Sequence, residues 1–174
     1  RDLVRSRGLG DVYKRQDNIC GGNSRFTGSQ GSSVLKLFGL TAASTGINEK
    51  AAQAAGITYD KVVLFPASHA AYYPGAQSMA MKVLYEKESL RLLGAQIVGG
   101  DGVDKRIDVL ATAIRAKMTA LSLTELDLSY APPYSSAKDP VNMAGFMIED
   151  LESGKVRQFH WNEVEDLPCD GSAT

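Results

Sequence analysis

Tyrosines gather in two irregular, proline-bearing stretches of the chain. Tyr72 and Tyr73 lie in SHAAYYPG, and Tyr130 and Tyr134 lie in SYAPPYSSAKDP. Neither stretch has the periodicity of a helix or a strand, and functional side chains concentrate in loops. A phenol, with an ordinary pKa of about 10, can donate a hydrogen bond to a developing thiolate or oxyanion, or share a proton with it. These tyrosines are therefore candidates for chemistry, and the alternative is that their rings close the edge of a core or an interface.

Other nucleophiles and metal ligands are scattered along the chain. His69 and His160 are the only histidines, so the sequence predicts neither a catalytic triad nor a metal site. Two cysteines, Cys20 and Cys169, lie near opposite ends without the spacing of a disulfide framework or a zinc site. No cation stands directly beside Cys20 to lower the pKa of its thiol. This cysteine usage favours a reducing, cytoplasmic location.

A glycine-rich run, GGDG at residues 99–102, follows a predicted strand and precedes a predicted helix. That place suits a phosphate-binding loop, but the run lacks the G-x-G-x-x-G spacing of dinucleotide-binding proteins. A plain turn before a helix is therefore the favoured interpretation, and a phosphate-binding loop is the alternative.

Length and composition limit the function classes. The 174 residues have room for one ordinary domain with loose ends. The chain is 44% hydrophobic and 22% charged, which is typical of a folded globular protein. Its net charge of −1 argues against a nucleic-acid partner. No apolar run approaches the roughly 20 residues of a membrane span, so no membrane partner is expected.

The two ends of the chain differ in pattern from the body. Residues 1–16 are basic, have no periodic apolar positions, and resemble a translated sequencing adapter, so we predict no element there. An authentic basic arm is the alternative. Residues 17–30 are rich in glycine and serine and are predicted to be a connection. Residues 31–152 form the predicted domain, and residues 153–174 form an acidic tail.

The first half of the body predicts two strands and a short helix. A mostly apolar run at 34–43 predicts a buried strand, and residues 61–65 predict a second strand. Between them a helix is expected, with Asn48 as its cap, Glu49 in its first turn, and Gly56 just past its end.

The second half predicts a hairpin and two longer helices. Residues 78–98 alternate as a hairpin that turns at 86–89. A last helix is expected to be capped by Asp139, to start at Pro140 and to stop at Gly154. The helix before it is indicated by one apolar stripe at helical spacing, made of Ile107, Leu110, Ala111, Ile114 and Met118. The fold class is therefore α+β, an antiparallel sheet with helices packed on one face.

Four blocks of the chain resemble a known family. They are, in order, SSVLKLFGLTAASTGINEKAA, SHAAYYPG, LLGAQIVGGDGVDKRIDVLATAI and LSYAPPYSSAKDPVNMAGF. Together they are similar to the C-terminal dimerisation domain of the pyridine nucleotide-disulfide oxidoreductases. Within that family they resemble the branch that holds coenzyme A-disulfide reductases, NADH oxidases and peroxidases.

The resemblance implies that this chain is the dimerisation domain of a larger homodimeric enzyme. Such an enzyme passes electrons from NAD(P)H through FAD to a cysteine and then to coenzyme A disulfide, a persulfide, oxygen or peroxide. The FAD and NAD(P)H sites of the parent would lie upstream, so this chain is expected neither to bind these cofactors tightly nor to catalyse alone. A self-contained module that binds a small ligand or acts as a scaffold is the alternative.

The resemblance also implies roles for particular residues. Tyr72 and Tyr130 match positions where phenols reach the partner's cysteine and the bound coenzyme A thiol, and Tyr73 and Tyr134 are the alternates. Asp17 and Asn18 would be a remnant of a helix beside the flavin. VRQFHWNEVEDL, within residues 153–174, resembles the start of a rhodanese-type domain, and a simple acidic tail is the alternative.

Overall fold

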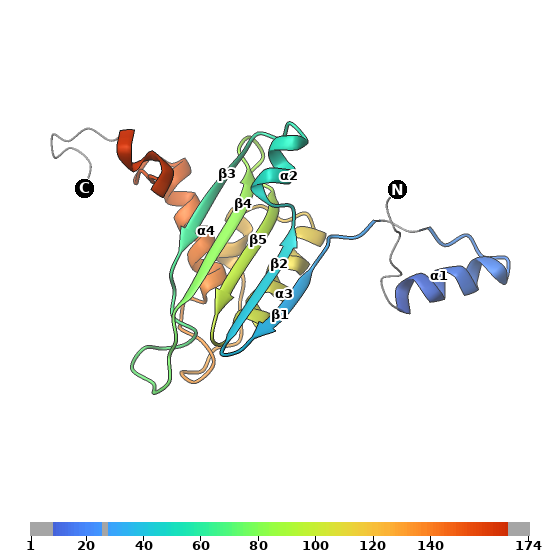
Figure 1. Cartoon of the computed structure of the whole chain (residues 1–174), viewed down its shortest axis with the longest axis horizontal. Helices are drawn as coiled ribbons and strands as arrows, with labels where there is room; N and C mark the ends of the chain where they lie inside the picture. Colours follow the sequence, from blue (N-terminus) through green and yellow to red (C-terminus); the bar gives the residue numbers. More distant parts are fainter. Residues whose placement is uncertain (1–8, 26–27, 167–174) are drawn as a thin grey trace.

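The structure is a computed structural model that describes residues 9–25 and 28–166. Within those ranges, strands form one antiparallel sheet in the order β1-β2-β5-β4-β3 (Figure 1). Their bounds are β1 Ser33–Leu37, β2 Leu40–Gly46, β3 Tyr59–Leu64, β4 Met79–Glu86 and β5 Leu92–Gly99. The helices are α1 Leu9–Ile19, α2 Glu49–Ala54, α3 Val103–Arg115 and α4 Pro140–Glu152, with short 3-10 helices at η1 Leu121–Glu125 and η2 Trp161–Asp166.

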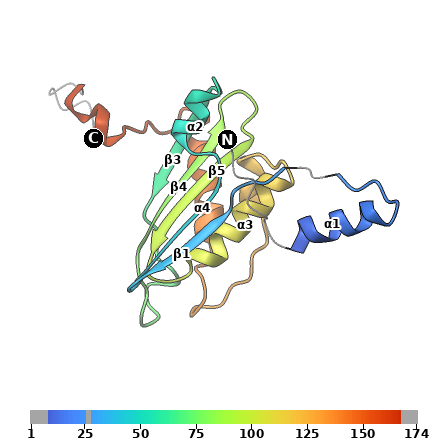
Figure 2. The same cartoon turned by 45° about the vertical axis from the view of Figure 1, so that its right-hand side comes forward.

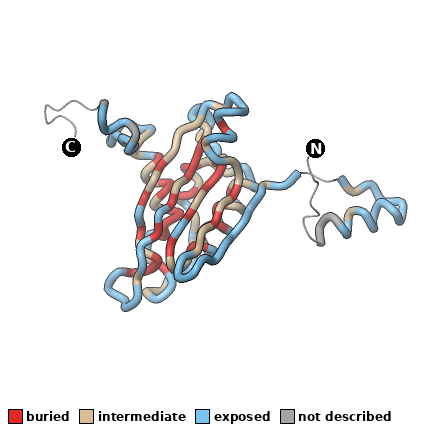
Figure 3. The backbone as a smooth tube through the Cα atoms, in the orientation of Figure 1, coloured by how far each residue is buried: buried red, intermediate tan, exposed pale blue. Residues whose placement is uncertain are grey.

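The core lies between the sheet and the two long helices, α3 and α4, which cover the same face (Figure 2). Buried residues gather there and are sparse in α1 and in residues 153–166 (Figure 3). The core includes Val62, Met81, Val83, Ala95, Ile97, Ile107, Leu110, Val141, Ala144 and Ile148. The predicted α+β class, with helices packed on one face of an antiparallel sheet, is therefore confirmed for the long helices. The short helix α2 lies over the opposite face, at one end.

The predicted hairpin is formed by β4 and β5. Met81 lies opposite Ile97, and Val83 lies opposite Ala95. Met79, Met81, Val83 and Tyr85 are all buried, so the alternation in the sequence marks the face that packs on the helices. The last helix begins as expected, since Asp139 accepts from Val141 N and Pro140 is its first residue.

The prediction of a single buried strand at 34–43 is wrong. Residues 33–46 form two strands joined by a tight turn at Phe38 and Gly39, with Leu37 opposite Leu40. Phe38, not the glycine, takes the positive φ of 52°. β1 is an edge strand whose residues are all exposed. A run of apolar residues concealed the turn because its left-handed position is occupied by phenylalanine.

The expectation that residues 1–16 contain no element is also wrong, because α1 begins at Leu9. Val12, Tyr13 and Ile19 are exposed on this helix, at 45%, 64% and 84%. The apolar positions 9, 12, 13 and 19 fall on one side of an ideal helix, so this segment does carry a helical pattern that the prediction for residues 1–16 overlooked. In the described part of the chain, no helix has the length and hydropathy needed to cross a membrane.

The short helix α2 follows the capping rules that the sequence indicated. Asn48 Oδ1 accepts from Ala51 N at 2.9 Å, and Glu49 lies in the first turn. Gly56, just past the helix, has a φ of 66°. The strand expected at 61–65 is β3, which begins earlier, at Tyr59.

Candidate functional site

Two loops carry the candidate tyrosines to the same end of the sheet (Figure 1). The first loop connects β3 to β4 over residues 65–78, and the second precedes α4 over residues 126–139. Ala70 N donates to the carbonyl of Ser135 at 3.1 Å, which joins the two loops. An isolated bridge between Ala67 and Ser78 narrows the base of the first loop. The loops are thus one connected unit.

Tyr72 and Tyr130 meet at the tips of these loops. Their hydroxyl oxygens are 3.3 Å apart, although 58 positions separate them in the sequence. Tyr72 is 76% exposed and Tyr130 is 49% exposed, so both phenols face outward. The hydrogen bond with Tyr130 raises the pKa of Tyr72 above its ordinary value, so this phenol keeps its proton at neutral pH. The pair can therefore offer a hydroxyl proton to a group that approaches from outside.

The two alternate tyrosines serve the loops differently. Tyr73 packs edge-on against His69, with ring centroids 5.9 Å apart. His69 is buried, and its ring nitrogens lie 3.1 Å from Ser68 Oγ and 3.3 Å from the carbonyl of Pro74. This histidine holds the first loop together. Tyr134 is exposed, and its backbone nitrogen closes a turn onto Ala131.

A buried ion pair lies directly beneath the loops, at residues whose pairing the sequence does not indicate. Arg106 of α3 and Asp139 are 1% and 3% exposed, and Nη2 lies 3.0 Å from Oδ2. Arg106 stands three positions after Val103 and four before Leu110, so it lies on the apolar stripe of α3. A cation at a core-facing position rarely stays buried without a partner, so its place in the sequence could have indicated a buried ion pair. Lys105 Nζ is 3.8 Å from the same carboxylate.

Asp139 is held in its ionised form. Burial opposes its ionisation, but hydrogen bonds from Ser135 Oγ and Val141 N, together with the charge of Arg106, lower the pKa of this carboxyl below its ordinary value. The same carboxylate caps α4, which packs on the sheet. The anion is therefore fixed by the fold as well as by its partner.

The glycine-rich run at 99–102 forms the turn and helix start that the sequence favoured, and α3 begins at Val103. Neighbouring side chains occupy the space beside these glycines. A Cβ on Gly100 would lie 1.5 Å from Gln77 Oε1, and a Cβ on Gly102 would lie 2.1 Å from Arg106 Nη1. The side chains of Gln77 and Arg106 therefore fill the space that these glycines leave open. This geometry does not support the alternative of a phosphate-binding loop.

The N-terminal candidates make local contacts. Asn18 Nδ2 donates to the carbonyl of Ser24 at 2.9 Å, and Asn18 Oδ1 accepts from Ser24 N at 2.8 Å. Ser24 Oγ donates to Asp17. Asp17 and Asn18 thus hold the turn that follows α1. Cys20, in that turn, is an exposed free thiol, and Cys169 lies outside the described residues.

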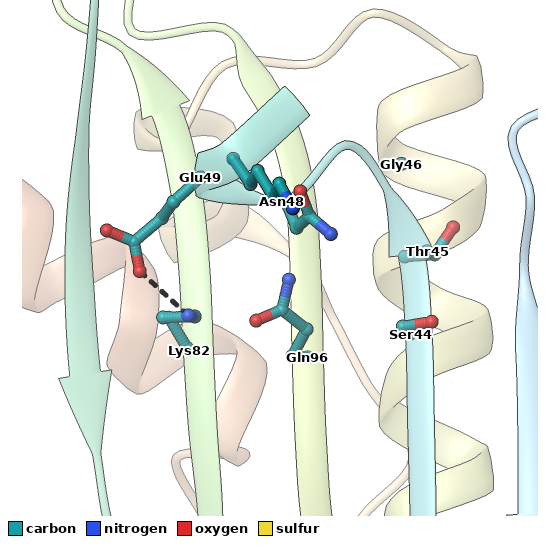
Figure 4. A pocket seen from close by; sticks show the side chains of 8 residues that line it. Ser44, Thr45, Gly46, Asn48, Glu49, Lys82 and Gln96 are labelled. Carbon is teal, nitrogen blue, oxygen red and sulfur yellow. Dashed lines mark hydrogen bonds and ion pairs between the residues drawn. The ribbon is translucent and has the colours of Figure 1, made fainter. Parts of the chain in front are cut away.

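A polar pocket of about 390 Å³ lies on the opposite face of the sheet, beside α2 (Figure 4). Glu49 reaches over this face to Lys61 and Lys82, at 2.5 and 2.8 Å. Burial opposes ionisation of Glu49, but hydrogen bonds from Lys61 and Lys82 lower its pKa to about 2. The Glu49 carboxylate thus pairs with the two lysine ammonium groups, and these ion pairs attach α2 to the sheet. Among the described residues, no group of three or more histidine, cysteine, aspartate or glutamate side chains is placed to hold a metal.

Residues 33–141 match the family model described as "Pyridine nucleotide-disulphide oxidoreductase, dimerisation domain". A coenzyme A disulfide reductase of Staphylococcus haemolyticus is 43% identical over 129 residues, which are 74% of this chain and 29% of that protein.

Solved structures agree with that match. The reduced CoADR-RHD of Bacillus anthracis superposes with a TM-score of 0.82 at 48% identity, over 86% of this chain and 27% of that chain. An NAD-dependent persulfide reductase from A. fulgidus has a TM-score of 0.82 at 42% identity, over 89% and 30% of the two chains. The chain thus spans less than a third of the length of these relatives.

Proposed function

Since the chain belongs to the pyridine nucleotide-disulfide oxidoreductase family, as its dimerisation domain, we propose that it pairs two subunits and supplies Tyr72 and Tyr130 to the partner's active site. The single observation that carries the proposal is the 3.3 Å approach of the two hydroxyls, from loops far apart in sequence, on an exposed surface. The substrate class is a coenzyme A disulfide or a related persulfide, since relatives named as reductases of these compounds are 42–43% identical to this chain.

The chemistry proposed for the pair is stabilisation of a leaving thiolate. A thiol of ordinary pKa near 8.5 is about 1.5 units more acidic than a phenol, so complete proton transfer from tyrosine to the thiolate is uphill by roughly 2 kcal/mol. The hydrogen bond that raises the pKa of Tyr72 makes the transfer less favourable still. Donation of a hydrogen bond is therefore the better role. One tyrosine hydroxyl donates to the hydroxyl of the other, and that second hydroxyl donates its own hydrogen bond to the sulfur.

Members of the family depend on FAD and NAD(P)H. Asp17 and Asn18, the positions implied to lie beside the flavin, bond Ser24 in this structure, and Arg106 fills the space at the start of α3. We assign no step of flavin chemistry to this chain, and we propose that it is inactive alone. The parent's site of action is proposed to be the cytoplasm, which the cysteine usage favours. The rhodanese-like start at residues 153–174 stays a prediction.

The exposure of the two phenols supports an open half-site over a self-contained ligand-binding module. A module would enclose Tyr72 and Tyr130 within one subunit, whereas they are 76% and 49% exposed. An outward-facing pair needs a second surface to exclude water and complete the site.

The proposal is tested in a chimaera in which residues 33–141 replace the matching segment of the Bacillus anthracis protein, which is 48% identical to this chain. Tyr72→Phe and Tyr130→Phe are expected to lower the rate of coenzyme A disulfide reduction by about 10²-fold, as for the loss of a donor that stabilises the leaving thiolate. Flavin content and dimer formation should be unchanged. Tyr134→Phe is the matched control, because its ring lies outside the pair. Unchanged kinetics in the Tyr72→Phe, Tyr130→Phe double variant would reduce the pair to surface packing.

A further inference from the structure

We infer that Arg106 is the positioning residue for the tyrosine pair, because one guanidinium buried under the site bonds the backbone of both tyrosine loops. The inference rests on the proposed function of Tyr72 and Tyr130. It goes beyond that function by naming the residue that sets the distance between the two hydroxyls.

The contacts of Arg106 Nη2 divide between the two loops. In the first loop, Nη2 donates to the carbonyl of Ser68 at 2.9 Å, four residues before Tyr72. In the second loop, it lies 3.3 Å from the carbonyl of Tyr134, four residues after Tyr130. The same nitrogen also lies 3.3 Å from Ser135 Oγ. Each loop is therefore held to one nitrogen at a point four residues from its tyrosine.

The rest of the side chain fixes that nitrogen in space. Nη1 donates to the carbonyl of Gly102 at 3.1 Å, at the start of α3. Nε and Nη2 approach the two carboxylate oxygens of Asp139 at 3.4 and 3.0 Å. Both α3 and α4 pack on the sheet, so these contacts anchor the guanidinium to the helices of the core as well as to the loops.

Burial makes this arrangement stiff. Arg106 is 1% exposed and Asp139 is 3% exposed, so water cannot replace a protein acceptor that moves away. Movement of either loop would leave a buried charge short of a partner, which is costly. A planar fork with donors on three nitrogens is required to reach all these acceptors, and a lysine offers its donors from one point only.

The first test uses the chain itself with Arg106→Lys, and Arg91→Lys as the control at an exposed arginine. Tyrosine labelled with ¹³C at Cζ allows the Tyr72 phenol to be titrated by NMR. We expect the Tyr72 pKa to fall toward its ordinary value in Arg106→Lys, because the hydrogen bond to Tyr130 is lost, and to stay in place in Arg91→Lys. A folded Arg106→Lys chain with the wild-type Tyr72 titration and the same contact between the two rings would overturn the inference.

A second variant covers the case in which Arg106→Lys does not fold. Arg106→Met combined with Asp139→Asn removes both buried charges, while asparagine still caps α4. The same loss of the raised Tyr72 pKa is expected. Wild-type titration in this double variant would overturn the inference. So would the loss of folding in both variants, because the ion pair would then be a stability element and not a positioning one.

The chimaera separates this inference from the proposed function. There, Arg106→Lys is expected to lower kcat for disulfide reduction by about tenfold, with flavin content unchanged, because the phenols are displaced from the reacting sulfur. If Tyr72→Phe and Tyr130→Phe leave the kinetics unchanged, the proposed function fails, and the Tyr72 titration still decides whether Arg106 sets the geometry. If the tyrosine variants lose activity while Arg106→Lys keeps both activity and titration, only the role of Arg106 fails.

Discussion

Gly102 leaves open the space in which Arg106 places its guanidinium. A Cβ on Gly102 would lie 2.1 Å from Arg106 Nη1, and the φ of this glycine is 69°. Gly102, which directly precedes α3, thus has two independent reasons to lack a side chain, one in the backbone and one in the buried ion pair beside it. The two reasons can be separated, since Gly56 has a φ of 66° and nothing within 4 Å of its Cβ position.

Gly102→Ala is predicted to lower the free energy of unfolding by about 3 kcal/mol, from left-handed strain and from displacement of the buried guanidinium. Gly56→Ala, which meets the strain alone, is predicted to cost about 1 kcal/mol. Urea unfolding of both variants measures the difference. Equal losses of unfolding free energy in the two variants would show that the Arg106 guanidinium moves away freely and does not need the space beside Gly102.

The stability of the domain is predicted to depend on Glu49 at acid pH. Its pKa is lowered from 4.5 to about 2 in the folded chain, where Lys61 and Lys82 donate to it. A depressed carboxyl pKa stabilises the fold above the unfolded value and loses that contribution as pH falls from about 4.5 to about 2. Because the Glu49 side chain is 25% exposed, solvent screens the pair, and we expect about 1–2 kcal/mol.

The measurement compares Glu49→Gln with wild type by urea unfolding at pH 7 and at pH 2.5. The variant should be less stable at pH 7, and the difference should shrink at pH 2.5. Glu88→Gln, at an exposed turn position, is the control and should match wild type at pH 7. A stability difference that persists at pH 2.5 would mean that Glu49 acts through packing rather than through its charge.

The fold could be predicted where side-chain periodicity coincides with burial. β4 alternates because one face packs on α3 and α4, and Asn48 and Asp139 mark helix starts because their side chains satisfy backbone donors. The turn at Phe38 could not be predicted, since its positive φ falls on a residue that rarely adopts it. The helix α1 was missed for a different reason: its few apolar positions stand among charged residues, and Val12, Tyr13 and Ile19 are exposed instead of packed on the core.

The candidate site divides in the same way. Tyrosines in proline-bearing loops are conspicuous in a sequence, so the four loop tyrosines stood out, whereas the choice of Tyr72 and Tyr130 among them rested on the family resemblance and stays a prediction. The partners of Arg106 stand 33 and 38 positions away, at Asp139 and Ser68, and nothing local in the sequence indicates them. Only the packing of α3 against both loops brings them together.

Self-association is predicted for the chain, as expected of a dimerisation domain. The β1–β2 hairpin presents large apolar side chains to solvent, with Phe38 93% exposed and Leu35 62% exposed. An exposed apolar edge strand is prone to pair with another surface. Sedimentation velocity should show a concentration-dependent dimer, and Leu35→Lys with Phe38→Lys should weaken it about tenfold or more, since charges at the contact must be desolvated.

The control for this prediction is Val156→Lys, at an exposed apolar position in the C-terminal segment. It should leave the dissociation constant unchanged. A chain that stays monomeric at high concentration would contradict the prediction of a dimer. A dimer that tolerates the two lysines in the hairpin would place the contact on another face of the molecule.

The last prediction concerns the attachment of α4 to the sheet. Tyr85 on β4 is buried, and its hydroxyl donates to Glu152, the last residue of α4, at 2.8 Å. Burial and this hydrogen bond both raise the pKa of the phenol, so it stays protonated and the bond persists at alkaline pH. Tyr85→Phe is predicted to lower the free energy of unfolding by about 1 kcal/mol, the net value of one hydrogen bond, because Glu152 lies at the surface and regains water. Urea unfolding measures this, with Tyr13→Phe on the exposed face of α1 as a control that should have no effect. Unchanged or increased stability of Tyr85→Phe would mean that the aromatic ring alone, through its packing in the core, holds α4 in place.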